Sequence, residues 1–314
     1  MRRAAALALL CLASGASAAS SPWSEKAYGV LLVGPDGGQE WNVFVTAVKK
    51  RLGASVPVEA FAGPLETKSL QKALDRFQAS RARKVVIVPL FLHSASKEYD
   101  QLKYILGIEK LPSREFLDSW GMRSRVVPRA KTKAALVLGL PLGTDEAVSD
   151  VLKERAKDGA RRGPAETALL LGAGTGDEGE NSARLKDIEA HAGKLEGAKA
   201  YLLRPGSKDK PRQGADSEHK LQELAQTMAH AGRVVVVPYL VVNDGSLRAW
   251  KKVLSNPFLR WVEKGLLPHE RLARWASDRA EALRGAPDQV RFKDAGQALP
   301  ATERGRKNEW GQNR

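Results

Sequence analysis

The chain has 314 residues, a hydrophobic content of 43%, a charged content of 28% and a formal net charge of +15 at pH 7. This length supports two domains of ordinary size, and the composition excludes disordered, collagen-like and membrane-embedded proteins. The single cysteine, Cys11, lies in the N-terminal leader described next, which excludes disulfides, thiolate catalysis and cysteine-ligated zinc from the rest of the chain.

The first residues have the pattern of an export signal. Two arginines precede an apolar run over residues 4–12, and an Ala-Ser-Ala triplet at 16–18 supplies the small residues of a cleavage site. The run is shorter than the ~20 residues that a membrane-spanning helix needs. We therefore expect a cleaved signal peptide over residues 1–19 and an exported protein, periplasmic or secreted, without an integral membrane segment after cleavage.

The positive charge favours an acidic partner, which would be a nucleic acid, an anionic lipid or a small polycarboxylate. Much of the charge falls in an expected loop at 204–212 and in the C-terminal tail. No basic run is interleaved with aromatic residues, and no expected helix concentrates the charge on one face, so we expect no nucleic-acid partner.

Strands and helices alternate through the first half of the chain. The apolar patterns predict strands at 28–34, 56–61, 85–92 and 134–140, and helices at 43–52, 65–79, 98–107 and 145–155. The strand at 85–92 has no polar residue apart from Pro89, which indicates burial on both faces in a parallel sheet. Alternation of this kind is typical of an α/β fold with right-handed crossovers.

A segment of linker composition at 157–165 precedes a second half with the same order. The patterns predict strands at 168–172, 198–203 and 233–242, helices at 181–195, 216–231 and 246–254, and further helical sequence at 260–283. The sequence therefore predicts an α/β protein with two similar domains, each a parallel β-sheet flanked by helices. We place these domains at 26–160 and 165–283, and a disordered basic tail at 284–314.

Two motifs occur twice. KVVIVPLFL at 84–92 is repeated as RVVVVPYLV at 233–241, and the strands at 31–33 and 169–171 each run into a glycine turn. The copies are separated by a whole domain, whereas a solenoid repeats every ~20–50 residues. The pattern therefore indicates a tandem duplication, in which each half builds its part of a site in the same place.

In an open parallel sheet, ligands bind beyond the carboxyl ends of the strands. Four segments fall there, at 34–42, 92–100, 172–181 and 241–248. Neither glycine turn is followed by a phosphate-binding lysine or completes a GxGxxG pattern, so we expect no nucleotide. The candidate polar residues in these segments are Asp36, His93, Glu98, Asp100, Asp177, Asn243 and Asp244.

These motifs resemble those of the CbiX-type sirohydrochlorin chelatases, class II chelatases that insert cobalt or iron into a tetrapyrrole. The resemblance rests on LLVG at 31–34, VPLF at 88–91, EYDQ with YILG at 98–107 and LLPH at 266–269, and it covers roughly residues 28–280 in tandem. It implies a chelatase-like lyase that holds Co²⁺, Fe²⁺ or Ni²⁺ and an acidic tetrapyrrole in a cleft between the two domains.

The resemblance also implies roles for the candidate residues. His93 and Asp36 would hold the metal, and a nearby base, Glu98 or Asp100, would accept the pyrrole protons. Three residues of the second half would contact the bound molecule: Asn243, Asp244 and Asp177.

The family's other histidines are missing. Pro35 or Asp36 stands where the first turn of the family carries histidine, and Ala173 stands there in the second copy. Two functions therefore remain open: an exported chelatase, or a non-catalytic module that holds a metal, a tetrapyrrole or another anion outside the cytoplasm. A third alternative is a scaffold that binds anionic lipid or polymer through its basic loops. Each candidate residue could also be purely structural, as a strand end, a turn residue or a helix start.

Overall fold

The computed structural model describes residues 28–112, 117, 128–160, 167–206 and 212–290. The predicted signal peptide and the tail beyond residue 290 lie outside these residues. Among the helices that the structure describes, none combines the length and the apolar character that crossing a membrane requires.

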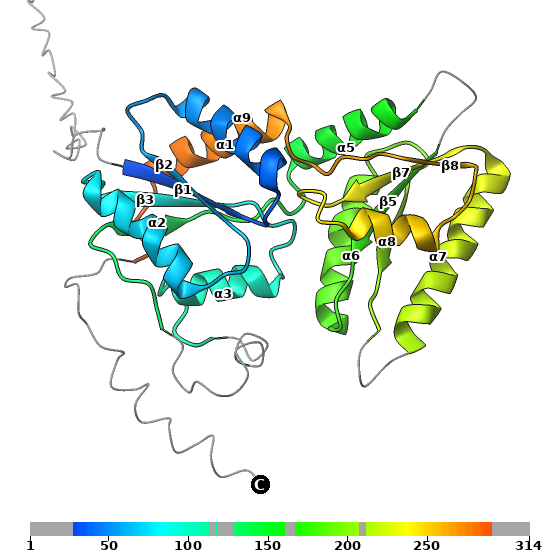
Figure 1. Ribbon diagram of the computed structural model, residues 1–314, viewed down its shortest axis with the longest axis horizontal. Helices are drawn as coiled ribbons and strands as arrows, with labels where there is room; N and C mark the ends of the chain where they lie inside the picture. The colour runs from blue at the N-terminus through cyan, green and yellow to red at the C-terminus, as the bar shows by residue number, and fades with distance from the viewer. Residues whose placement is uncertain (1–27, 113–116, 118–127, 161–166, 207–211, 291–314) are drawn as a thin grey trace, which may run out of the picture.

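The protein has two lobes that lie side by side, each built on a four-stranded parallel sheet (Figure 1). The first sheet has the order β2-β1-β3-β4 and comprises β1 (Tyr28–Gly34), β2 (Val58–Ala62), β3 (Lys84–Pro89) and β4 (Ala135–Leu138). The second has the order β6-β5-β7-β8 and comprises β5 (Thr167–Ala173), β6 (Lys199–Leu203), β7 (Val234–Tyr239) and β8 (Leu259–Trp261). The predicted fold class is confirmed.

Helices cover both faces of each sheet. In the first half they are α1 (Gly38–Leu52), α2 (Thr67–Ala79), α3 (Lys97–Ile105) and α5 (Glu146–Gly159). In the second half they are α6 (Glu178–Ala192), α7 (Arg212–Ala231), α8 (Ser246–Val253) and α9 (Glu270–Arg284). The central strands β1, β3, β5 and β7 are almost completely buried, as their continuous apolar runs predict.

Two helices cross between the lobes: each packs on the opposite lobe from the strand that precedes it in the sequence. Although α5 follows the last strand of the first sheet, it packs against β7 and α6 of the second lobe. At the end of the chain, α9 returns to the first lobe and packs on α1 and β3. Tyr28 Oη donates a hydrogen bond of 2.6 Å to Glu281 of α9, and Lys84 Nζ donates one of 2.9 Å to the carbonyl of Arg284. One apolar core therefore continues from the first lobe through α5 and α9 into the second.

Two predictions about the C-terminal region are wrong. Residues 259–261 form the edge strand β8, although the sequence from residue 260 was predicted to be helical. Three residues are too few to show strand periodicity, and it is pairing with β7 that makes them a strand. Residues 285–290, assigned above to the disordered tail, lie against β4, where Val290 pairs with Leu136 and the Gln289 side chain accepts a hydrogen bond of 2.8 Å from the backbone of Leu138.

Candidate functional site

Loops from the carboxyl ends of the two sheets contact each other where the lobes meet, and we call this contact the seam. The backbone N–H of Asn243, after β7, donates a hydrogen bond of 3.2 Å to Glu40 Oε2 on α1. A Cβ atom added to Gly37 would lie 2.4 Å from Val242 Cγ1, so only glycine allows the loop after β1 to approach so closely. The strand-end segments predicted from the sequence therefore do face each other.

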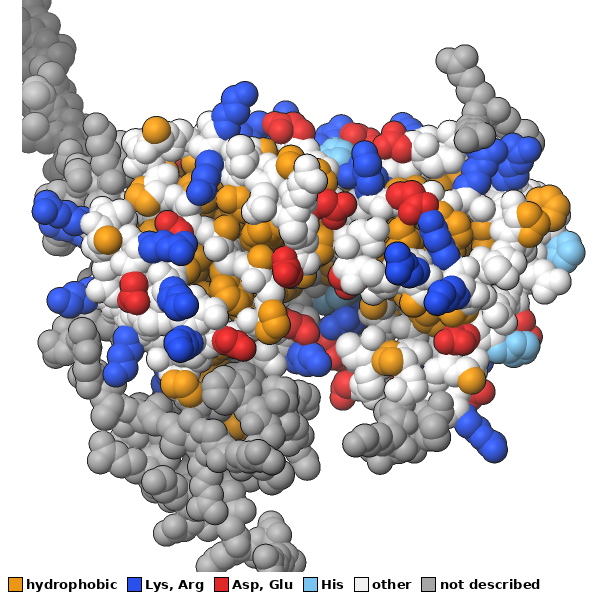
Figure 2. All heavy atoms as spheres, in the orientation of Figure 1, with side chains coloured by type: hydrophobic (Ala, Val, Ile, Leu, Met, Phe, Trp, Pro, Cys, Tyr) orange, Lys and Arg blue, Asp and Glu red, His pale blue; other side chains and the backbone are white. Residues whose placement is uncertain are grey.

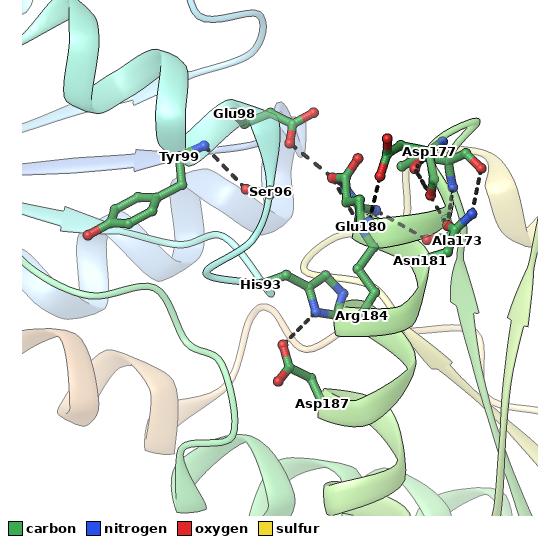
Figure 3. A network of polar contacts seen from close by, with 11 residues as sticks. His93, Ser96, Glu98, Tyr99, Ala173, Asp177, Glu180, Asn181, Arg184 and Asp187 are labelled. Carbon is green, nitrogen blue, oxygen red and sulfur yellow. Dashed lines mark hydrogen bonds and ion pairs between the residues drawn. The ribbon is translucent and has the colours of Figure 1, made fainter. Parts of the chain in front are cut away.

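His93 is the histidine in the loop after β3, and it lies in the seam against α6 (Figure 3). Its Nδ1 atom is 2.9 Å from Asp187 Oδ2, and the residue is only 4% exposed. The ring of Tyr239, at the end of β7, lies 5.5 Å from the imidazole, centroid to centroid. His93 thus belongs to the first lobe but is enclosed by residues of the second.

The seam keeps the His93 imidazole neutral. Burial lowers the pKa of His93 below its ordinary value of 6.5, and the hydrogen bond to Asp187 offsets this only in part. A neutral imidazole that faces a carboxylate carries its proton on the facing nitrogen, so Nδ1–H donates to Asp187 and Nε2 keeps a lone pair. Within the described part of the chain, Nε2 makes no hydrogen bond, and it points along α6 toward Arg184 (Figure 3).

Arg184 places a positive charge beside His93. Its guanidinium lies 2.6 Å from Glu180 Oε1 on the same helix and 3.9 Å from Glu98 Oε2 across the seam. It also donates a hydrogen bond of 3.2 Å to the carbonyl of Ala173, at the end of β5. The seam at α6 therefore combines one neutral imidazole with a network of two carboxylates and one guanidinium.

The other predicted residues make short-range contacts that fit structural roles. Asp100 forms an ion pair with Lys103, 2.6 Å away and one turn later in α3. Asp36, which is exposed, accepts a hydrogen bond from the backbone of Gly38 at the start of α1, and Asp177 caps α6 by accepting one from Glu180. The side chains of Asn243 and Asp244 each accept one from a backbone N–H two residues later. Only His93 and Glu98 among the predicted residues are joined through their side chains to the opposite lobe.

Sequence reasoning missed the residues that surround His93. Besides Asp187 and Arg184, these include His191, which is fully buried one turn after Asp187 and whose ring centroid also lies 5.5 Å from that of Tyr239. Nδ1 of His191 lies 2.7 Å from the Ser149 hydroxyl, and Nε2 lies 2.9 Å from the carbonyl of Gly143. The four-residue spacing of 187 and 191 on a predicted helix was the only available signal, because it places both side chains on one face.

The described residues do not include a group of three or more histidine, cysteine, aspartate or glutamate side chains that could hold a metal ion. They do provide one imidazole that Asp187 orients, which is the usual arrangement of a metal-binding histidine and its outer-shell carboxylate. A hollow opens between the lobes on the side of α3 and α6, and acidic and basic side chains line it (Figure 2). The site can therefore supply one nitrogen ligand, but not a complete ligand set of its own.

Comparison with known proteins supports the resemblance stated above. Residues 34–159 match the family model described as CbiX. Among the curated proteins, none matches the chain by sequence.

Similar solved structures include chelatases. SirB from Bacillus subtilis with Fe³⁺ is 17% identical and has a TM-score of 0.55, with 84% of this chain and 99% of that chain covered. DR2241 from Deinococcus radiodurans, described as a multi-domain protein with structural similarity to chelatases, is 19% identical with a TM-score of 0.53, and the match covers 84% of this chain and 56% of that chain. At these identities the likeness establishes the shared fold: two chelatase-like lobes in one chain.

Proposed function

We propose that this protein binds a metallated tetrapyrrole at the seam, and that Nε2 of His93 would hold the macrocycle's Co²⁺, Fe²⁺ or Ni²⁺ ion. The proposal rests mainly on one observation, which is the neutral His93 imidazole, held by Asp187 with its second nitrogen unbonded, between two chelatase-like lobes. Neutral imidazole is a suitable ligand for each of these metals.

The ligand count favours holding a metal that is already in its macrocycle over inserting a free one. Insertion requires the protein to hold the free ion with several ligands while a nearby base takes up the pyrrole protons. The described residues offer no group of three such ligands. A tetrapyrrole contributes four nitrogens itself, so a single imidazole would be enough to complete the hold on its metal. The proposed activity is therefore that of a non-catalytic carrier.

The charge of the chain supports an acidic cargo. Sirohydrochlorin-type macrocycles carry several carboxylates. The formal net charge of +15 falls only to +13 (15 − 2) when Arg2 and Arg3 leave with the leader, and it attracts such anions over a long range. At the seam itself, the Arg184 guanidinium is within 3.9 Å of Glu98 but is bonded more closely to Glu180. Arg184 could turn from Glu98 to a carboxylate of the cargo without losing its contact with Glu180.

We further propose that the carrier works outside the cytoplasm. The leader over residues 1–19 supports export, since it combines a positive start, a short apolar run and a cleavage triplet. Tetrapyrrole biosynthesis takes place inside the cell, so export favours a binding role over a biosynthetic one.

The test is a spectroscopic titration of the purified protein with cobalt-loaded and metal-free sirohydrochlorin. The cobalt complex is expected to show a shift of its main absorption band on binding, and His93→Ala is expected to abolish the shift. Added imidazole should restore it by occupying the position that the side chain vacated. His219→Ala is the matched control, because His219 is 71% exposed on α7 and, among the described residues, pairs only with Glu223 on the same helix.

Three results would count against the carrier. An absence of any spectral change would overturn binding at the seam altogether. A band shift that survives in His93→Ala would show that His93 does not bind the metal. Metallation of sirohydrochlorin by Co²⁺ faster than the spontaneous rate, and lost in His93→Ala, would establish the chelatase enzyme instead.

A further inference from the structure

The second lobe has a cavity beside the N-terminal ends of its central strands, on the side away from the seam. Its volume is about 310 Å³, and Ala168 and Val235, each the second residue of its strand, form part of its wall. The seam is formed by loops that follow strand ends, whereas this cavity lies where the strands begin. The C-terminal end of α5 completes it, together with the turn between α6 and β6.

The cavity exists because small residues stand where these elements meet. A Cβ atom on Gly159 would lie 2.6 Å from Val235 Cγ1, so glycine lets the end of α5 press directly against β7. Beyond that contact, Ala156, Ala160 and Ala168 leave the space unfilled. Together with Leu195 and Val235 they give the cavity an apolar wall.

Three lysines surround this apolar wall, namely Lys153, Lys157 and Lys194. Lys153 Nζ is 4.0 Å from Asp150, at the limit of an ion pair. Within the described residues, neither Lys157 nor Lys194 has a carboxylate within that distance. Among the residues that the structure describes, Glu196 is the only acidic side chain that lines the cavity. We call this group of residues the lysine cavity.

Two lysines of the lysine cavity have no paired carboxylate. Lys153 lies at ion-pair distance from Asp150, and the C-terminal end of α5 carries roughly half a negative charge. Within the described residues no ion pair neutralises Lys157 or Lys194, and both stand next to an apolar wall that water solvates poorly.

We propose that the lysine cavity binds a small carboxylate that has an apolar body. The carboxylate would lie between Lys157 and Lys194, and the apolar part would fill the space beside Ala156 and Val235. A volume of about 310 Å³ lies at the lower end of the range of roughly 300–1,000 Å³ for ligand pockets, which limits the ligand to a short chain or a single ring. The site is separate from the seam, so its test and that of the tetrapyrrole proposal can fail independently.

The test measures the binding of octanoate by isothermal titration calorimetry, with acetate and 1-octanol as comparison ligands. Octanoate is expected to bind with a Kd below 1 mM, and acetate and 1-octanol at least tenfold more weakly, because each lacks one half of the recognised chemistry. Lys157→Gln and Lys194→Gln should each weaken octanoate binding at least fivefold, since each removes one of the two ammonium groups proposed to hold the carboxylate. Ala156→Leu should weaken it by filling the cavity without changing the charge.

Lys220→Gln is the matched control, because Lys220 is an exposed lysine of α7, on the opposite face of the same sheet. It should bind octanoate like the unmodified protein. Circular dichroism checks that each variant is folded. If Ala156→Leu does not fold, the test rests on Lys157→Gln and Lys194→Gln alone. The proposal is overturned if octanoate does not bind at 10 mM, if 1-octanol binds equally well, or if the glutamine variants of Lys157 and Lys194 bind like Lys220→Gln.

Discussion

Nδ1 of His93 lies 2.9 Å from Oδ2 of Asp187, and this contact between residues 94 positions apart ties the first lobe to α6 of the second. Both partners are largely shielded from water, with side-chain exposures of 5% and 21%. A hydrogen bond in such surroundings costs more to break than one at the surface, because the group left behind has lost its solvent. The contact therefore affects both how the lobes hold together and which nitrogen of His93 remains available.

Replacing Asp187 should destabilise the protein. Asp187→Ala is expected to lower the free energy of unfolding by about 1–3 kcal/mol, because it leaves the buried Nδ1–H of His93 without an acceptor. Asp187→Asn keeps a carbonyl acceptor and should cost less. Urea unfolding, followed by tryptophan fluorescence, measures both variants. Equal losses in the two variants would show that the hydrogen bond is not the source of the effect.

Stability should fall on mild acidification because of the seam histidines. Burial lowers the pKa of His93 and of His191 below 6.5, so the folded state keeps both rings neutral while the unfolded chain takes up protons. The stability that the two neutral rings contribute is therefore fully present above pH 6.5 and is lost as the pH falls below that value. Unfolding free energies measured between pH 8 and pH 5 should show this decline. His191→Gln should decline less steeply, whereas replacing the exposed His219 with glutamine should leave the slope unchanged.

The close approach of Gly37 to Val242 predicts a strong effect of one methyl group. Gly37→Ala places a Cβ atom 2.4 Å from Val242 Cγ1, and relieving the overlap should cost about 1–3 kcal/mol of unfolding free energy. The φ of Gly37, −137°, lies outside the left-handed region that favours glycine, so the cost should come mainly from the contact between the lobes. Val242→Ala in the same chain should recover much of the loss. Simple addition of the two single effects in a double-mutant cycle would contradict this explanation.

The residues after α9 should stabilise the edge of the first sheet. The Gln289 side chain accepts a hydrogen bond from the Leu138 N–H and donates one to its carbonyl, which satisfies both backbone groups at the end of β4. A chain that ends at residue 284 should unfold at a lower urea concentration than a chain that ends at residue 290, because it loses this contact and the pairing of Val290 with Leu136. Equal unfolding midpoints for the two truncations would show that residues 285–290 do not stabilise the edge of the first sheet.

Local sequence patterns were sufficient to predict most of the fold. The uninterrupted apolar runs at 85–88 and 234–237 are buried central strands, since only a strand covered on both faces needs to be apolar throughout. The packing of α5 and α9 could not be predicted in this way. Their amphipathic patterns show that one face of each helix is buried, but not which of two similar sheets covers it.

The candidate site was predicted less completely. The rule that loops after parallel strands gather at one edge located the segments at 92–100 and 241–248, and both take part in the seam. The partner of His93 depends on how one lobe docks on the other, and no local pattern encodes that. Asp187 therefore looked like any polar residue on a helix, while Asp36, Asp177 and Asp244 attracted attention as strand-end residues but make only local backbone contacts.

The return of α9 to the first lobe has a consequence for how the protein is made. Trp41 and Phe44 of α1 share one apolar core with Trp275 and Ala276 of α9. A ribosome synthesises α1 early, but it reaches α9 only after the strands of the second lobe. The half of the protein that is translated first can therefore complete its apolar core only after the second lobe has been translated.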